Sequence, residues 1–303
     1  MSVAELEIVE IQLEAPAGGL WSEAWYRLRR NVGAIIGFVI VAAFVIAAVF
    51  APLIAPSHPS NDVYLVDQIL QPQPPSTEHL LGLDIQGRDV FSRIVYGARY
   101  SLLIGVVSVS IGLSIGMLLG AVAGYFGRFV DSTIMRLMDI MLAIPGLLFA
   151  IAIVAMLGPG LWQVMIAVGV VNIPIFARLL RSSVLAHREN DYVLAARSVG
   201  VPRRKILFSH IIPNAISPVI VAGTLAMATA IIDVAGLGFL GLGPQDPSTP
   251  EWGTMLTDVN EYLAAAPYLA IIPGLAIVVS VLGFNLIGDG LREAMDPKMR
   301  GRA

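Results

Sequence analysis

The sequence predicts an all-α membrane protein with six transmembrane helices, and three observations lead to this fold class. Of the 303 residues, 56% are hydrophobic and only 14% are charged, whereas soluble globular proteins carry about 25% charged residues. Six apolar segments are long enough to cross the roughly 30 Å of hydrocarbon in a bilayer. Lys and Arg are concentrated in the segments that six spans would place on one side of the membrane.

The expected spans are residues 32–54, 100–124, 134–157, 161–180, 212–235 and 267–288. The stretch from Ile140 to Ala177 carries no charge and is too long for one span, so the Leu-Gly-Pro-Gly sequence at 157–160 must divide it. The first span is too long for the apolar region of a signal peptide, and we expect it to remain uncleaved.

The spans divide the chain into three parts. Residues 1–31 form a cytoplasmic N-terminal tail, in which Trp and Arg residues from Trp21 onward predict an interfacial helix. Residues 32–99 hold the first transmembrane helix and an external segment. Residues 100–303 form the core domain, which contains a polar, basic loop at 187–213 (the basic loop).

The distribution of cations predicts the orientation in the cell membrane. Sixteen of the 19 Lys and Arg residues lie in the two terminal segments and in the 125–136 and 178–210 regions. The other side has only Arg88, Arg93 and Arg99. The positive-inside rule therefore places both termini and the basic loop in the cytoplasm.

Composition excludes several kinds of chemistry. The chain has no cysteine, so disulfides, thiol catalysis and Cys-based metal sites are excluded. The four histidines are spread along the chain as unrelated polar residues, and we expect no metal site. A net charge of −3 indicates no nucleic-acid partner. A phosphate-binding loop needs Lys after Gly, but neither Lys205 nor Lys298 follows Gly, so another chain must hydrolyse any ATP.

The basic loop reads as two short helices joined by a turn. Asn190 or Asp191 can cap the first helix with a short polar side chain. Gly200 can end it in a left-handed conformation, and Pro202 then begins the next helix. Helical spacing places four residues of the first helix on one face, the apolar stripe: Tyr192, Ala195, Ala196 and Val199. An ordinary amphipathic helix on its own protein or on lipid headgroups would show the same pattern.

The second span carries small residues at every fourth position from Ser108: Gly112, Gly116, Gly120 and Gly124. Small residues at this spacing let two helices meet backbone to backbone in lipid. Tight packing inside the subunit is the simpler interpretation, and a moving interface or a pore lining is the alternative. Prolines also predict bends in or near several spans, at positions 145, 174, 213, 218 and 273.

Three polar residues in the spans are candidates for a translocation pathway. A carboxylate at membrane depth costs a few kcal/mol and usually faces a partner or a wet cavity. Asp233, near the outer end of the fifth span, suits an outward-facing cavity, and Asp139 is expected to pair with Arg136 or with a cytoplasmic neighbour. Asn172 is a polar helix contact or a third pathway residue.

The basic loop resembles the "EAA" cytoplasmic loop of ABC-importer permeases, through Ala195-Ala196, Gly200 and the His-Ile-Ile-Pro sequence at 210–213. In that family the loop docks into an ATP-hydrolysing subunit and couples it to transport. Leu194 replaces the glutamate that names the motif, and this leaves no charged contact at that position. The resemblance implies these ATPase-coupling residues: Asp191, Tyr192, Ala195, Ala196, Gly200, Arg203 and Arg204.

Three further segments resemble the C-type permease subunits of dipeptide and oligopeptide importers. Residues 79–102 are similar to the "LGTD…GRD…YGAR" segment of that branch, 236–256 to its "FLGLG…TPEWG" segment, and 284–297 to its "FNLLGDGLRDALDP" terminus. The resemblance implies a type I ABC-importer permease fold. It also implies a heterodimer with a homologous permease, two cytoplasmic ATPases that bind ATP and Mg, and an external solute-binding protein.

The expected function is thus a non-catalytic permease that couples ATP hydrolysis to peptide import by alternating access. The chain itself binds no cofactor. Nickel, glutathione and oligosaccharides are alternative solutes, because members of this branch carry them. A stand-alone ion-coupled transporter with Asp233 and Asp139 as ion sites is a rival function, disfavoured by the few buried charges and the absence of an inverted repeat. A membrane scaffold that transports nothing would leave the apolar stripe unexplained.

Overall fold

The computed structural model describes residues 20–59, 72–246, 248–257, 259 and 262–295, and these are almost entirely helical. The β structure among them is limited to isolated bridges that join Gln73 to Leu83 and Leu83 to Asp89. The N-terminal part of the chain forms α2 (Leu20–Leu28), α3 (Val32–Val49), α4 (Ala51–Ile54), α5 (Val90–Phe126), α6 (Arg128–Leu142) and α7 (Gly146–Leu157). The remainder forms α8 (Leu161–Arg188), α9 (Asp191–Ser198), α10 (Arg203–Lys205), a π-helix (Ile206–Ile211), α11 (Ile212–Ala215), α12 (Ser217–Phe239), α13 (Trp252–Thr257) and α14 (Tyr268–Met295).

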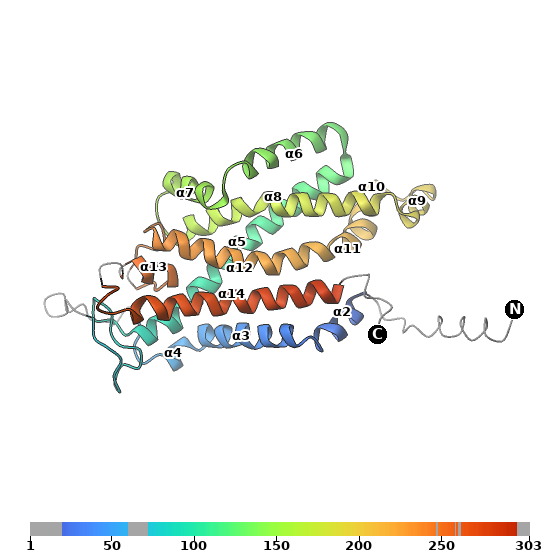
Figure 1. Ribbon diagram of the computed structural model, residues 1–303. Helices are drawn as coiled ribbons and strands as arrows, with labels where there is room; N and C mark the ends of the chain where they lie inside the picture. The colour runs from blue at the N-terminus through green and yellow to red at the C-terminus, as the bar shows by residue number, and fades with distance from the viewer. Residues whose placement is uncertain (1–19, 60–71, 247, 258, 260–261, 296–303) are drawn as a thin grey trace, which may run out of the picture.

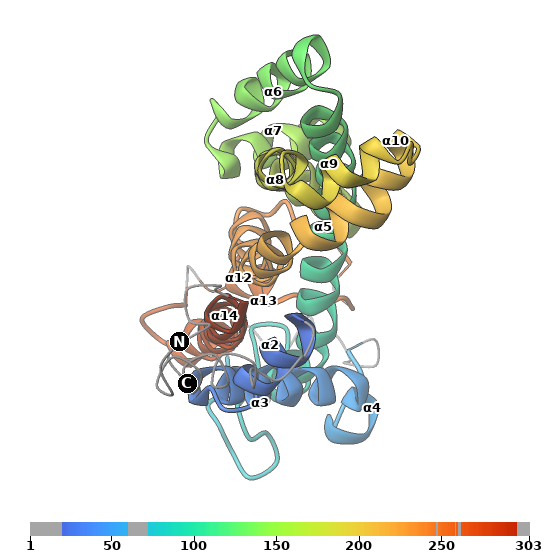
Figure 2. The same cartoon turned by 90° about the vertical axis from the view of Figure 1, so that its right-hand side faces the viewer.

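Five of the described helices are long and apolar enough to cross a membrane, and α6 with α7 can form a sixth, bent span. This agrees with the predicted all-α transmembrane fold. The long helices lie side by side along one axis, and α5 crosses behind them (Figure 1). Seen from one end, α3 and α14 lie at one edge and α6 at the other, with α5 running past both groups (Figure 2).

The two ends of the bundle differ in content. One end carries α2, the last turn of α14, α9 and α10, and the other carries α13 and the segment that precedes α5 (Figure 1). The basic loop therefore lies at the same end as the start of the first span and the end of the last. This common placement is what an even number of spans predicts.

The third span, expected over 134–157 with a bend at Pro145, is strongly bent. Its helical residues form two helices, α6 and α7, that meet at an angle of 91°. Pro145 is the last residue of the break, and proline cannot donate the backbone hydrogen bond that would continue the helix. The predicted bend at this proline is therefore confirmed, and α6 and α7 together can form the one bent span.

The second span begins ten residues earlier than expected, at Val90 rather than residue 100. The carboxylate of Asp89 caps it, because one oxygen accepts the backbone N–H of Ser92 at 2.7 Å. The resulting helix has 37 residues, about 55 Å at 1.5 Å per residue. It is therefore longer than the hydrocarbon is thick, and its first turns lie at the end of the bundle that carries α13 (Figure 1).

The described part of the N-terminal tail is α2, which packs on α14 through Ala24, Leu28 and Ala294. Trp25 and Tyr26 are exposed and carry cations over their rings: Arg29 lies 4.5 Å from the Trp25 ring centroid and Arg30 lies 4.1 Å from that of Tyr26. This arrangement fits a helix at the membrane surface. Residues 1–19 of the tail lie outside the described residues.

The closest helix contact in the bundle joins α5 and α8, and the predicted glycines lie in it. A Cβ at Gly112 would lie 2.8 Å from the Asn172 side chain, and one at Gly116 would lie 2.7 Å from the backbone oxygen of Ile173. Gly120 faces the backbone of Ala177 in the same way. Gly124 faces Arg181 and Val184, with 3.0 Å to the nearest atoms. The four glycines therefore let α8 approach α5 at backbone distance.

Candidate functional site

The α9 helix projects from one end of the molecule, beyond the ends of the long helices (Figure 1). Asn190 is its N-cap residue in extended conformation, but its side chain makes no capping hydrogen bond. The side-chain nitrogen Nδ2 of Asn190 instead lies 3.2 Å from His187 Nδ1. The same ring nitrogen also lies 3.2 Å from the Tyr192 hydroxyl. Of the two expected caps, Asn190 takes the position and Asp191 opens the first turn, where a carboxylate stabilises the helix dipole.

Gly200 ends α9 as expected. Its φ is +74°, a left-handed conformation that costs other residues about 1 kcal/mol or more. Its N–H donates to Arg197 O at 3.0 Å, and the following N–H of Val201 donates to Ala196 O at 3.0 Å. No heavy atom lies within 4 Å of the position that a Cβ at Gly200 would occupy, so the glycine serves the turn and not a close contact.

The apolar stripe is largely open to the surroundings. Tyr192 and Val199 are 39% and 80% exposed, and Ala195 is also exposed. Ala196 turns partly inward and packs on the core. Val193 is fully buried on the opposite side of α9. A partner can therefore reach Tyr192, Ala195 and Val199 without any change in the fold.

The basic loop packs directly against the membrane helices. Val193 belongs to the same buried cluster as Ile206 and Ile211 of the π-helix and as Phe176 and Leu180 of α8. Pro213, which has no N–H to donate, follows the π-helix directly. Arg203 and Arg204 are exposed on α10, between α9 and the π-helix. A force on α9 therefore reaches α8 and α12 through packed side chains.

Two ion pairs join α6 to α8. Arg178 binds Asp139, and Arg181 donates from Nε and Nη2 to the two carboxylate oxygens of Asp131. Asp139 therefore pairs with Arg178 of α8, the first residue of the 178–210 region that was predicted to be cytoplasmic. Of the two expected alternatives, the structure shows a neighbour from that region and not Arg136. The sequence contained a signal for Arg178, because it is the first charged residue after the long apolar run that ends at Ala177.

The Asp139–Arg178 pair lies on an open face of the chain, with side chains 61% and 48% exposed. Ser132, Arg136 and Asp139 follow one face of α6 at helical spacing, and all three are exposed. Exposed Ser182 lies one turn after Arg178 on α8. We call this set the polar stripe: Ser132, Arg136, Asp139, Arg178 and Ser182. Charged side chains within spans face water or protein rather than lipid.

The other pathway candidates lie elsewhere. Asn172 is only 5% exposed, packs against Gly112 and donates to Val168 O at 2.8 Å, so it is a helix contact and lines no open face. Asp233 is partly buried near the end of α12 that adjoins α13. The structure thus separates the three residues onto α6, α8 and α12.

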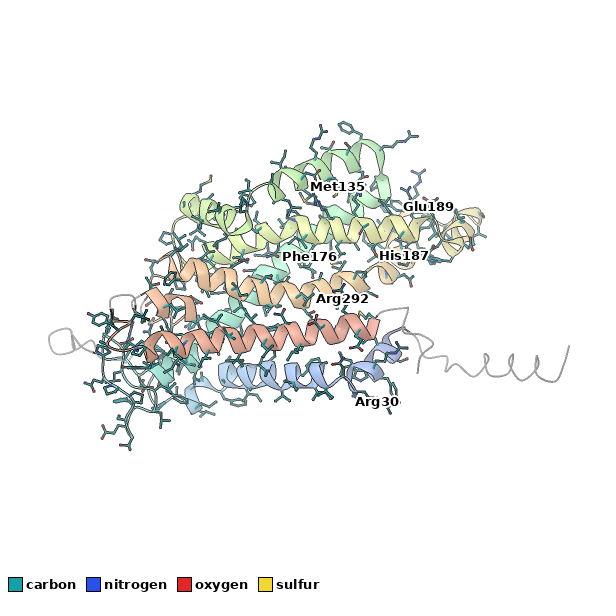
Figure 3. The ribbon with its side chains drawn as sticks, viewed as in Figure 1. Arg30, Met135, Phe176, His187, Glu189 and Arg292 are labelled. Carbon is teal, nitrogen blue, oxygen red and sulfur yellow. The ribbon has the colours of Figure 1, made fainter. Side chains whose placement is uncertain are left out.

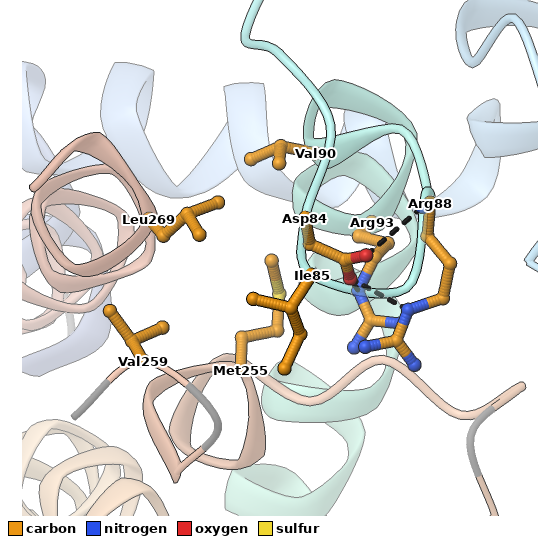
Figure 4. Close-up of a pocket in the computed structure, with 8 residues that line it drawn as sticks. All are labelled: Asp84, Ile85, Arg88, Val90, Arg93, Met255, Val259 and Leu269. Carbon is orange, nitrogen blue, oxygen red and sulfur yellow. Dashed lines mark hydrogen bonds and ion pairs between the residues drawn. The ribbon is translucent and has the colours of Figure 1, made fainter. Parts of the chain in front are cut away.

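The opposite end of the bundle is closed by a buried network. Asp84 accepts Arg88 Nε at 2.6 Å and Arg93 Nε lies 3.6 Å away (Figure 4). The cavity beside this pair measures only about 20 Å³, roughly the space of one water molecule. The arginines at this end therefore hold the segment before α5 in place. A larger cavity of about 240 Å³ lies on their other side, between the same two arginines and the segment that links α12 to α13.

Glu251 and Trp252 complete the closure. Trp252 is fully buried, and its indole N–H donates to Ile94 O at 3.1 Å. The Glu251 carboxylate accepts the backbone N–H groups of Gly253 and Thr254 at 2.8 and 2.9 Å. Burial raises the pKa of Glu251 to about 7, although these two hydrogen bonds lower it.

Comparison with known proteins decides the family. Residues 116–301 match the family described as "Binding-protein-dependent transport system inner membrane component". Residues 19–75 match "N-terminal TM domain of oligopeptide transport permease C". The chain belongs to this family of transport permeases. The predicted relationship to C-type permeases of peptide importers is therefore confirmed, and the chain is a multi-pass inner-membrane protein.

Relatives and solved structures agree with this assignment. The permease is 49% identical to the dipeptide transport system permease protein DppC of Alkalihalophilus pseudofirmus, over 92% of this chain and 90% of the relative. It is 46% identical to a di/tripeptide permease of Pseudomonas aeruginosa, over 93% of each chain. It is 44% identical to the glutathione permease GsiD of Escherichia coli, over 93% of this chain and 91% of that one.

The fold resembles that of the MetNI methionine ABC transporter in an inward-facing conformation. The TM-score is 0.56 at 18% identity, and the match covers 67% of this chain and 96% of the other. This likeness confirms the type I ABC-importer permease fold.

Proposed function

We propose that this permease is the membrane subunit of an ATP-driven importer of dipeptides and oligopeptides. The α9 helix carries the proposal, because it presents an exposed apolar stripe at the tip of a loop that is packed into the membrane helices. The most similar relatives described above are named as dipeptide and di/tripeptide permeases. The chain performs no covalent chemistry in this function.

The proposed partners follow from the family and the surfaces. Two cytoplasmic ATPases bind ATP and Mg, and one of them receives α9 through Tyr192, Ala195 and Val199, with Asp191, Arg203 and Arg204 at the edges. A homologous second permease completes the passage, and an external solute-binding protein delivers the peptide. Both termini and the basic loop lie in the cytoplasm, as the excess of cations at this end indicates.

Alternating access is the proposed mechanism. ATP binding brings the two ATPases together and moves α9 with them. Because Val193 packs on the π-helix and α8, this motion rocks α8 and α12 and opens the passage outward. The tight α5–α8 contact through the glycines keeps these two helices together as one body during the motion.

The polar stripe is the proposed wall of the passage in this chain. Lipid cannot cover Asp139 and Arg178 without a large desolvation cost, so this face is turned toward the second permease and the water between the two subunits. The paired charges suit a zwitterionic peptide better than a neutral sugar. Asp233 was the candidate for an outward-facing cavity. It lies near the α13 end of α12, where the passage opens outward in this proposal.

Glutathione is the second candidate solute, because a glutathione permease is 44% identical to this chain and glutathione is itself a tripeptide. Nickel and oligosaccharides have the weaker case, since the relatives described above are named for peptides and glutathione. A stand-alone ion-coupled transporter would need no docking helix and would import peptide along an ion gradient without added ATPase.

Replacement of Ala195 by tryptophan tests the docking stripe. A bulky ring on this open alanine blocks close approach of a partner backbone, so ATP-dependent dipeptide uptake by the reconstituted transporter should fall at least 10-fold while the permease still folds. Ala186→Trp on α8 is the matched control, because Ala186 is also an exposed alanine at this end. Normal uptake and normal ATPase retention by Ala195→Trp would contradict docking through the stripe.

A further inference from the structure

A basic pocket lies beside α9, between the basic loop and the ends of the membrane helices. Its volume is about 540 Å³, more than ten times the roughly 30 Å³ that a water molecule occupies. It is lined by residues from the ends of α5 and α8 and from the loop, including Tyr125, Phe126, Arg188, Glu189, Arg197 and Arg203. Figure 3 shows Glu189 at the end of α8, next to α9.

Cations exceed anions in the basic pocket. Arg188 donates to Glu189 at 3.0 Å and to Gly124 O at 3.4 Å, so one arginine is already paired. Arg197 and Arg203 are exposed, and neither forms a salt bridge with the described residues. The guanidinium group matches phosphate oxygens through paired hydrogen bonds. The chemistry of the pocket therefore selects a phosphate-bearing anion.

The basic pocket and the apolar stripe lie on different sides of α9. Residues two apart in a helix are rotated by about 200°, so Arg197 points away from exposed Ala195. Arg197 follows Val193 by one turn and shares its side of the helix, and Val193 is fully buried against the membrane domain. A partner docked on the apolar stripe therefore leaves the pocket open toward the membrane.

Aromatic side chains place this pocket at the membrane surface. Phe126 ends α5 and is 61% exposed, and Phe129 in the first turn of α6 is 82% exposed. Beside them, Tyr125 of the pocket lies in the last turn of α5, and amphipathic tyrosine rings at the end of a spanning helix sit at the level of the lipid headgroups. Basic pockets between transmembrane helices at this level suit anionic headgroups.

We propose that the basic pocket binds the phosphate of an anionic phospholipid. The headgroup would lie between Arg188 and Arg197, with the acyl chains leaving past Phe126, while Arg203 at the edge of the pocket is left to the ATPase. A lipid bound there would brace the basic loop against α5 and α8. The consequence for transport rests on the proposed function, but the binding itself does not.

Lipid retention by the purified full-length permease with its partner subunits tests the proposal. After delipidation in detergent, phosphatidylglycerol is added and the number of bound molecules is measured by native mass spectrometry. Arg197→Gln should weaken binding about 5-fold, the effect of removing one cation near an anionic headgroup. Arg197→Lys, which keeps the charge, should recover much of it. Arg30→Gln is the matched control, because it removes a cation from α2 at the same end and should change binding less than 2-fold.

Four outcomes would overturn the assignment. Equal binding of phosphatidylcholine would show that only the acyl chains bind, and equal loss in Arg30→Gln would show general surface attraction. Displacement by millimolar inorganic phosphate without any lipid preference would make the ligand a free anion. Release of the lipid whenever the ATPase binds would assign the pocket to the ATPase.

A transport measurement separates this proposal from the proposed function. In proteoliposomes, uptake per ATP hydrolysed should be several-fold higher with phosphatidylglycerol than with phosphatidylcholine alone, and Arg197→Gln should remove the difference. A permease that binds the lipid but imports no peptide would contradict the proposed function alone. One that imports peptide but binds no anionic lipid would contradict this inference alone.

Discussion

The two ends of the permease carry short helices of opposite character (Figure 1). At one end α9 buries Val193 and leaves most of its other side chains exposed. At the other end α13 and the residue before it bury Glu251 and Trp252 completely between α5, α12 and α14. The α9 end thus presents a surface that another molecule can contact, and the α13 end packs the permease's own helices together.

In the proposed function, a partner ATPase moves this permease, and the two ends must meet different requirements. The end that contacts the ATPase needs an accessible surface that is packed onto the moving helices, as α9 is through the π-helix. The opposite end needs a fixed junction, so that motion at α9 tilts whole helices instead of pulling them apart. Substitutions at α13 should therefore affect stability first, and substitutions at α9 should affect transport first.

Trp252→Ala should have the largest effect on stability. The indole is fully buried, contacts Phe44 edge to face at 5.3 Å and lies against Gly97. Its removal should cost about 3–5 kcal/mol, measured as thermal unfolding of the detergent-solubilised permease by circular dichroism. Trp162→Ala is the control, because Trp162 is 64% exposed and its loss should change unfolding little. Equal effects of the two substitutions would remove the contrast between the ends.

The stability of the α13 end should depend on pH through Glu251. Its pKa rises from 4.5 to about 7 on folding because the carboxyl is buried. Folding therefore favours the protonated carboxyl. Its contribution to the free energy of unfolding is fully present below pH 4.5 and is lost as the pH rises to about 7. The free energy of unfolding should fall by about 3 kcal/mol over this window.

Thermal unfolding measured from pH 4.5 to 8 checks this prediction. Glu251→Gln has no proton to lose, so its unfolding temperature should vary less with pH than that of the native permease. Glu78→Gln, at an exposed glutamate of the same end, should retain the native pH dependence. A pH profile unchanged by Glu251→Gln would contradict the role of burial.

Gly200→Ala should have the smallest effect on stability, about 1 kcal/mol, since only backbone strain opposes the added methyl group. The strain acts on the end of α9, so hydrogen exchange of residues 191–199 should accelerate about 5-fold and uptake should fall. Gly158→Ala is a matched control: Gly158 has φ +88° and equally open space, but it lies in the turn before α8. Uptake that falls equally in both variants would show that strain alone, and not its place in α9, impairs transport.

Much of the fold follows from local sequence. Apolar length and composition predict the membrane helices because a buried backbone in lipid must satisfy its own hydrogen bonds. The end of α9 follows from Gly200, whose left-handed conformation few other residues adopt. The apolar stripe was predicted from spacing alone, because helical periodicity assigns residues to a face without reference to the rest of the molecule. Its exposure was not: Tyr192, Ala195 and Val199 are exposed, whereas Ala196 packs partly on the core.

Tertiary structure alone decided the contacts between distant residues. Pro145 predicted a bend, but only packing against α8 sets the 91° angle between α6 and α7. The sequence offered Arg136 or a cytoplasmic neighbour as the partner of Asp139 but could not choose between them, and packing selected Arg178 across the helix interface. Spacing determines which residues share a face of one helix. Which faces meet depends on how the helices pack, and that is a property of the whole chain.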